Sequence, residues 1–240
     1  MVEGWNALDK KLFRDLLRMP GQIVAIVLIV VIGIASLVTM MSAYSSLKVA
    51  QTTYYDQYRF ADVFVRLERA PDSLISRLQA IPGVRTVQTR VIEDVTLSVE
   101  GMAAPATGRL ISIPERPTPM LNDLFIRTGR YPEQGDEVLA SEAFANANHL
   151  GINDTVGAII NGRWQTLRIV GTALSPEYVY ELRGTEVVAD NQRFGVFWMQ
   201  RNALSTAFNM RGAFNDVSIA LMKDAHDAEV IYQLDQRLAS

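Results

Sequence analysis

Cysteine is absent from this chain of 240 residues, and histidine occurs only twice. Without cysteine the chain has no disulfides, no thiolate metal sites and no cysteine nucleophile. His149 and His226 lie far apart along the sequence and in unlike contexts, which argues against a histidine-based metal site. The formal net charge of −3 argues against binding to nucleic acid, because that function needs a basic face opposite the phosphates.

Motifs for catalysis and for nucleotide binding are also missing. The chain has no G-x-S-x-G, H-E-x-x-H, G-x-x-x-x-G-K-[ST] or G-x-G-x-x-G sequence. The acidic pairs Glu93-Asp94 and Asp136-Glu137 are interpreted as solvated turns rather than as acid and base partners, because adjacent side chains point in different directions. The sequence predicts that the chain is not an enzyme, needs no cofactor or metal, and cannot by itself bind and hydrolyse ATP through a phosphate loop.

One long apolar segment is present. The 19 residues from Ile23 to Met41 contain no charged side chain, and a bilayer requires about 20 such residues in a helix. A secretory signal has a shorter apolar region of about 7–15 residues, and a buried core helix normally keeps a polar face. We therefore predict a retained transmembrane helix over 22–44, with Tyr44 at the membrane interface and a small helix-packing face at Gly33 and Ser36.

The residues before this segment carry its topology signals. The cations here outnumber those that follow the segment. This asymmetry predicts that the N-terminus lies in the cytoplasm and that the main domain is periplasmic or extracellular. The predicted location of the helix itself is the plasma (inner) membrane. Apolar residues at helical spacing predict an amphipathic helix over 1–21 that lies on membrane lipid, although an ordinary basic flank would also satisfy the topology rule. The residues singled out for interface and topology are Trp5, Lys10, Lys11, Arg14, Arg18, Pro20 and Gly21.

Beyond the span, 45–61 contains neither proline nor glycine and predicts a helical stalk. Tyr54, Tyr55 and Tyr58 lie too far from the membrane for an interfacial belt. They are expected to pack either on the folded domain, the favoured alternative, or on a partner helix.

The remaining sequence predicts an α+β domain in two lobes. Strand and helix patterns alternate over 62–115 and again over 190–240, which predicts a core lobe built of β-α-β units. Short strands punctuated by glycine over 116–189 predict an inserted β-rich lobe, either a small barrel or a sandwich. Asn161-Gly162 within it is a strong hairpin signal. Tyr178 and Tyr180 either form a recognition edge or cover the sheet.

The order of these parts resembles the N-terminal region of FtsX-like ABC transporter permeases of the MacB and LolC type. The resemblance covers residues 10 to 240, and Asn153 stands where the family usually has glycine. The matching segments are "LQAIPGV", "TLRIVGTALSPEYVY", Gly129-Arg130-Tyr131-Pro132, Glu137-Val138-Leu139, Leu150-Gly151-Ile152 and Asp154-Thr155-Val156.

The resemblance implies a first membrane helix that leads into a periplasmic core domain. It also implies a second permease protomer, a separate cytoplasmic ABC ATPase as partner, and a chain that re-enters the membrane after Ser240. The amphipathic residues before Pro20 would be the elbow helix of that family. The favoured function is thus a permease subunit, or an N-terminal piece of one, in ABC-type export or mechanotransmission. A single-span binding or adaptor protein and a secreted enzyme behind a cleaved signal are the alternatives.

Overall fold

The first element that the structure describes in full is one long helix, α2. The computed structural model describes residues 11, 14, 18–181 and 188–238. Helix α2 runs over 38 residues, Pro20–Gln57, which corresponds to about 57 Å at 1.5 Å per residue. None of its residues is buried within the chain's own fold. It includes the predicted span 22–44 and is the one candidate membrane span in the described part of the chain.

Helix α2 ends four residues earlier than the predicted stalk. Arg59 adopts a left-handed conformation with a φ of 50°, and the Phe60 amide donates a hydrogen bond to the Tyr55 carbonyl at 2.9 Å. This is the hydrogen-bond pattern of a Schellman C-cap, with arginine in the place that glycine usually takes. The stalk is therefore helical only through Gln57, and the chain turns at Arg59 into the folded domain.

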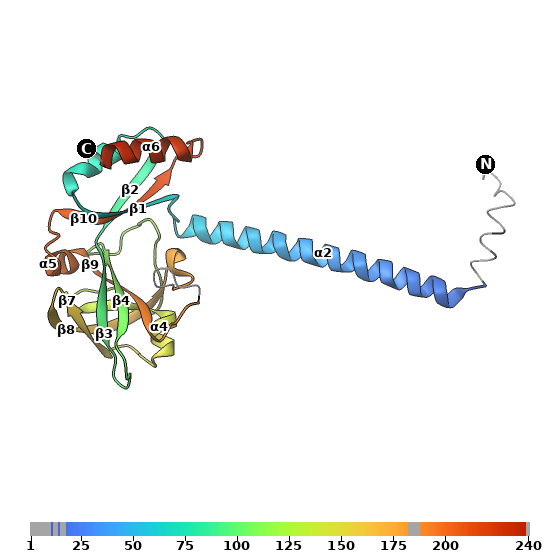
Figure 1. Cartoon of the computed structure of the whole chain (residues 1–240), viewed down its shortest axis with the longest axis horizontal. Coiled ribbons are helices and arrows are strands. Elements are labelled where there is room, and N and C mark those ends of the chain that lie inside the picture. The colour runs from blue at the N-terminus through green and yellow to red at the C-terminus, as the bar shows by residue number, and fades with distance from the viewer. Residues whose placement is uncertain (1–10, 12–13, 15–17, 182–187, 239–240) are drawn as a thin grey trace. The chain divides into compact units, whose positions relative to one another are not determined.

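The first β structure after the helix is a three-stranded antiparallel sheet with the order β1-β10-β2. Its strands are β1 (Val63–Pro71), β2 (Val84–Arg90) and β10 (Ala213–Leu221). Three helical segments accompany it: η1 (Asp72–Leu74), α3 (Ile75–Gln79) and α6 (Asp227–Leu238). Helix α6 lies across the sheet (Figure 1) and buries Val230 and Leu234 against Leu78 and Phe214.

A second sheet of seven strands has the order β5-β8-β6-β9-β4-β3-β7. Its strands are β3 (Ile92–Ser98), β4 (Ala106–Ile113), β5 (Phe125–Gly129), β6 (Glu137–Ser141), β7 (Thr155–Ile160), β8 (Arg163–Leu174) and β9 (Phe194–Gln200). The short helices associated with it are α4 (Glu142–Ala147), η2 (Pro176–Tyr178) and α5 (Arg201–Ala207).

Strand β8 closes this sheet into a barrel. Residues Arg163 to Arg168 pair with β7, and residues from Arg168 onward pair with β6. Because β7 also pairs with β3, six strands form a continuous ring, and β5 extends from β8 outside it. Of the two predicted alternatives, barrel and sandwich, the pairing supports the barrel. The Asn161-Gly162 hairpin is confirmed, with positive φ at both residues as a type I′ turn requires.

The predicted α+β class is confirmed, but the sheets divide the chain differently from the predicted lobes. Strands β3, β4 and β9 were expected in the core lobe, and they belong to the barrel instead. The physical reason is their pairing: β9 runs parallel to β4 and pairs with β6, which completes the ring. Only residues 63–90 and 213–238 form the smaller α+β layer. Whether either part folds as a separate lobe stays a prediction.

Candidate functional site

The candidate site is the junction at which the chain leaves α2 and enters the folded domain. Four aromatic side chains lie there in succession. The Tyr54 and Tyr58 rings are 4.8 Å apart, and Tyr55 stacks on Phe60 at 4.5 Å. Tyr58 meets Phe125 of β5 at 6.2 Å in an edge-on contact. The prediction that these tyrosines pack on the folded domain is therefore confirmed for Tyr58.

Backbone hydrogen bonds attach the same segment to the loop before β5. The Asn122 amide donates to the Arg59 carbonyl at 3.0 Å, and the Asp123 amide donates to the Tyr58 carbonyl at 2.8 Å. In return the Ala61 amide donates to the Asn122 side-chain oxygen at 2.9 Å. These three hydrogen bonds attach residues 58–61 to Asn122 and Asp123 of the loop before β5.

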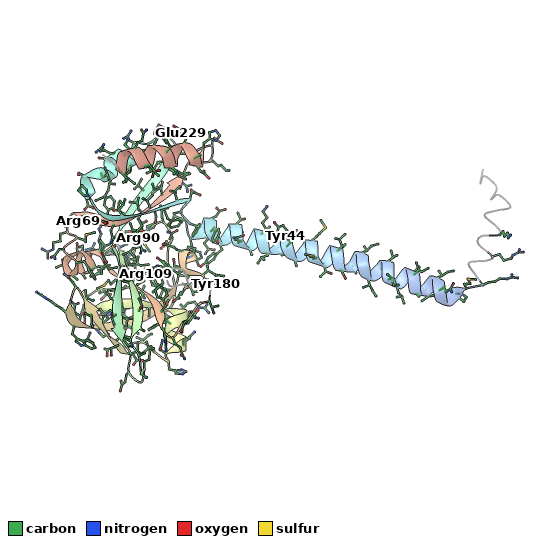
Figure 2. All side chains as sticks on the ribbon, viewed as in Figure 1. Tyr44, Arg69, Arg90, Arg109, Tyr180 and Glu229 are labelled. Carbon is green, nitrogen blue, oxygen red and sulfur yellow. The ribbon has the colours of Figure 1, made fainter. Side chains whose placement is uncertain are left out.

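From Asn122 a buried polar network extends to both sheets. The Asn122 side-chain amide donates to Glu177 of η2 at 3.0 Å. Glu177 accepts two hydrogen bonds from Arg90, at 2.6 and 3.1 Å. Arg90 also donates from Nε to Asp216 of β10 at 2.8 Å. Arg90 lies where the chain passes from β2 into β3, between the two sheets (Figure 2).

The network is charged as well as buried, since Arg90 is only 5% exposed and Asp216 only 6% exposed. Burial lowers the pKa of Arg90, but the charges of Glu177 and Asp216 outweigh it and hold that pKa above its ordinary value. Burial raises the pKa of Asp216, and the Arg90 charge opposes this. One guanidinium thus compensates two carboxylates, and removing it would leave them uncompensated.

A second buried carboxylate, Glu137, holds the turn before β6. It is fully buried and accepts hydrogen bonds from Arg130, Arg168 and the Glu133 amide. The hydrogen bond from Arg130 is the main reason that its pKa is lowered to about 2. The interpretation of Asp136-Glu137 as a solvated turn is therefore wrong for Glu137. The signal in the sequence was Arg130, seven residues earlier, whose guanidinium reaches back to this carboxylate.

An open cavity of about 970 Å³ lies beside the junction. Strand β2 forms one wall, and the end of β4, the 118–121 loop and residues 55–60 form the others. Its charged lining residues are Asp56, Arg59, Arg85 and Arg201. Arg201 donates to the Thr89 carbonyl at 2.6 Å and to Asp72 at 3.0 Å. The sequence gave no signal for this cavity, because its lining comes from five separate segments.

Comparison with protein families decides where the chain belongs. The family described as the MacB-like periplasmic core domain matches residues 24–236. The chain is a member of that family. The resemblance to MacB-type permeases is thereby confirmed, and with it a domain that belongs to transporter permeases rather than to a catalytic family. The periplasmic family and the one candidate span together indicate a membrane-anchored protein with an extracellular domain.

Solved structures to which the chain is similar include two domains of transporters. The extracellular domain of the noncanonic ABC-type transporter YknZ from Gram-positive bacteria is 14% identical, covers 74% of this chain and 94% of its own, and has a TM-score of 0.43. The periplasmic region of MacB from Actinobacillus actinomycetemcomitans is 12% identical, with coverages of 71% and 75% and a TM-score of 0.42. The comparison with curated proteins gives no match. The family assignment rests on the match to residues 24–236.

The residues predicted to set the topology of this MacB-like chain lie at or before the start of α2. Lys11, Arg14 and Arg18 are exposed, and Pro20 and Gly21 open the helix, the position that proline favours. Trp5 and Lys10, and with them most of the predicted amphipathic helix, lie outside the described residues. The interfacial and topological roles of all seven stay predictions.

Within α2, the two small residues and the interfacial tyrosine are exposed. A Cβ added to Gly33 would meet nothing within 4 Å, Ser36 lies one turn further on, and Tyr44 is 67% exposed. No described residue therefore packs against Gly33. The assignments of Gly33 and Ser36 to helix packing and of Tyr44 to the interface stay predictions.

Tyr178 and Tyr180 differ in exposure. Tyr178 is half-buried and meets Trp198 of β9 edge-on at 6.5 Å, and burial raises its pKa well above the ordinary value. Tyr180 is 78% exposed, and its side chain is labelled in Figure 2. Tyr178 thus covers the sheet, and a recognition role of Tyr180 stays a prediction.

The described residues also bear on the predictions about metal ligands and the acidic pairs. In that part of the chain no group of three or more His, Asp or Glu side chains lies close enough to hold a metal ion. Of the first acidic pair, Asp94 pairs with Arg109 at 2.8 Å and Glu93 accepts a hydrogen bond from Asn215 at 3.0 Å. Of the arginines that line the cavity at the junction, Arg201 pairs with Asp72 and Arg59 contacts Asp123.

Replacing Glu181 by glutamine should remove a pH dependence of stability. Glu181 is 5% exposed, accepts a hydrogen bond from Ser141 at 2.9 Å, and has a pKa raised by burial to about 7. A carboxyl whose folded pKa is raised stabilises the fold fully below its ordinary pKa and loses that contribution as pH rises toward 7. In the wild type the free energy of unfolding should therefore fall by up to about 3 kcal/mol between pH 5 and 8.

Urea unfolding of the full chain in detergent, followed by circular dichroism at pH 5 and pH 8, measures this slope. The Glu181→Gln variant should show a flatter profile than the wild type. Glu229→Gln on the exposed face of α6 is the matched control and should keep the wild-type slope. An unchanged slope in Glu181→Gln would show that another group titrates.

Proposed function

We propose that this chain is the N-terminal part of an integral-membrane permease subunit in an ABC-type export or mechanotransmission system. Its N-terminus lies in the cytoplasm, the MacB-like domain lies outside, and a separate cytoplasmic ATPase supplies the energy. The subunit works with a second permease protomer. The chain contains no P-loop, so ATP hydrolysis falls to the partner.

The observation that supports this proposal best is the continuity of α2 with the junction. The helix is unbroken from Pro20 to Gln57 and contains no glycine or proline after Gly33. Interruptions of that kind are the usual causes of kinks. Its last turn includes Tyr54, and the residues that follow are bonded to the 121–123 loop. A helix without an interruption after Gly33 is suited to pass a displacement along its length to residues 54–57.

The buried polar network inside the folded domain supports the same function. Asn122, which accepts from the Ala61 amide, is linked through Glu177 to Arg90 and thereby to both sheets. A displacement at residue 61 therefore reaches the barrel and the smaller sheet through hydrogen bonds rather than through a loose linker. Packed networks with discrete arrangements are the physical means by which such movement passes between distant sites.

The test uses the complex isolated from native membranes with an affinity tag on the permease. A P-loop ATPase should co-purify with it. These 240 residues contain no cysteine, so a spin label at Glu229→Cys reports that position once any cysteines in the rest of the complex have been replaced by serine. Two protomers then give one distance distribution, which should change between ADP and trapped ATP states.

A matched pair of α2 variants separates transmission from simple anchoring. Ala50→Pro removes one helical hydrogen bond and kinks α2, whereas Ala50→Leu changes the same exposed position and keeps the helix. We expect Ala50→Pro to retain the ATPase but to lose the nucleotide-dependent distance change, and Ala50→Leu to keep it. The absence of any co-purifying ATPase, or a distance that ignores nucleotide, would contradict the proposal and favour a single-span adaptor.

A further inference from the structure

Strand β2 presents an open hydrogen-bonding edge. It is the last strand in the order β1-β10-β2, and Val87 stands opposite Ile219 of β10. The Ile219 carbonyl accepts from the Asp62 amide on the β1 side. Because the N–H and C=O of a strand residue point to the same side, Ile219 bonds toward β1. Val87 therefore turns its own backbone groups away from β10.

Thr89 and Val91, the next residues at every second position after Val87, also point their carbonyl groups away from β10. The Thr89 carbonyl accepts from Arg201 at 2.6 Å rather than from β10. The Val91 carbonyl accepts from the Ser112 amide at 2.9 Å, where the chain enters the barrel. Along this edge the Val91 carbonyl is bonded to Ser112 and the Thr89 carbonyl to the Arg201 guanidinium. Among the described residues the edge is open at Val87.

The open edge faces the cavity of about 970 Å³ described above, whose lining includes every residue from Arg85 to Thr89. Its opposite parts supply Tyr55, Phe60 and Met120 as apolar surface. Ligand sites fall in the range of about 300–1,000 Å³ and combine apolar walls with a few fixed polar groups. The backbone of an edge strand is such a polar group, and natural proteins normally cover or block it.

The charges around the cavity favour an anionic ligand. Arg59, Arg85 and Arg201 line it against one carboxylate, Asp56, although the whole chain has a net charge of −3. Arg201 is held by Asp72, and Arg59 has only a 3.4 Å contact with Asp123. Arg59 and Arg85 are both exposed, so their guanidinium groups are accessible to a carboxylate entering the cavity.

We propose that this cavity binds an extended peptide segment of a partner protein, which adds to β2 as a fourth strand of the smaller sheet. The partner's backbone bonds to Val87, and an acidic side chain reaches Arg85 or Arg59. Side chains of an extended peptide alternate between two sides, so an acidic and apolar alternation fits the two kinds of wall. The proposal goes beyond the permease function and does not depend on coupling to an ATPase.

The probe is a fluorescent peptide of about eight residues, the length of an ordinary strand, in which glutamate and valine alternate. Its fluorescence anisotropy is measured against the full chain in detergent. Two comparison peptides test the two parts of the proposal. One alternates lysine and valine, and the other has the acidic sequence with alternate backbone nitrogens methylated. The acidic peptide should bind, the methylated one should not, and the lysine peptide should bind at least about tenfold more weakly.

Val87→Pro removes the one donor that the proposal requires. Proline is tolerated on an edge strand when its nitrogen faces outward, so the ladder to β10 remains and circular dichroism should match the wild type. Binding of the acidic peptide should fall by about tenfold or more. Arg85→Glu should weaken the acidic peptide and strengthen the lysine peptide. Arg69→Glu, an exposed residue on the other edge strand, is the matched control and should change neither.

Three results would overturn the proposal. The first is that no acidic peptide binds the wild type, and the second is that the methylated peptide binds as well as the unmethylated one. The third is a dimer in sedimentation that Val87→Pro dissociates, which would assign the edge to a second copy of the chain. Loss of ATPase co-purification in the earlier experiment bears on none of these readouts, so the two proposals fail separately.

Discussion

Replacing Arg90 by methionine should lower the free energy of unfolding by about 3–5 kcal/mol, the cost of removing one partner from a buried ion pair. Arg90 donates to Glu177 and Asp216 in a region where the arginine is only 5% exposed. Without it two carboxylates lie near each other in a poorly hydrated space. Urea unfolding of the full chain in detergent gives the midpoint and slope from which this difference follows.

Two comparison variants sharpen the Arg90 experiment. Arg127→Met removes a pair with Glu142 whose members are 48% and 29% exposed, and it should cost less than about 1 kcal/mol. The triple change Arg90→Met, Glu177→Gln and Asp216→Asn removes all three charges and should restore part of the loss. A cost for Arg90→Met no larger than that for Arg127→Met would mean that the network adds little to stability.

Replacing Glu137 by glutamine should cost about 2–3 kcal/mol at pH 7. Its pKa is lowered to about 2, which by itself corresponds to a few kcal/mol of preferential stabilisation of the charged form. The guanidinium partners Arg130 and Arg168 are 45% and 33% exposed, so solvent screening reduces that figure. The neutral amide keeps the shape of the side chain but loses the charge that both arginines and two backbone amides contact.

The pH profile identifies the origin of the Glu137 effect. A carboxyl whose folded pKa is depressed stabilises the fold above its ordinary pKa and loses that contribution as pH falls toward 2. The wild type should therefore lose more stability than Glu137→Gln between about pH 5 and pH 2. Glu133→Gln is the control, since Glu133 is 74% exposed and 3.8 Å from Arg130. Parallel profiles for wild type and Glu137→Gln would rule out this carboxylate as the titrating group.

Both effects depend on residues whose importance the local sequence does not show. Arg90 meets partners 87 and 126 residues away along the chain. Glu137 follows an aspartate in a turn-rich segment, which locally is typical of a solvated loop. Burial of a charged side chain depends on which segments pack around it. No pattern of a few neighbouring residues contains that information.

The sequence was sufficient where structure depends on short-range interactions. An apolar run of membrane length, with no helix breaker after Gly33, predicts one long helix whatever the rest of the chain does. Asn161-Gly162 specifies its hairpin because both residues accept positive φ. Pro71 and Gly83 likewise bracket the short helical segment that includes α3.

Which strands share a sheet was decided only in the tertiary structure. The alternation in β3, β4 and β9 indicates strands but not their partners, because any strand can pair along either edge. Closure of the barrel comes from β8, which is long enough to pair with β7 at one end and β6 at the other. That closure leaves β2 at the edge of a separate small sheet and thereby creates the cavity. The sequence determined the membrane helix, the hairpin and the family, whereas long-range pairing determined the junction, because contacts between distant segments form only when the whole domain is assembled.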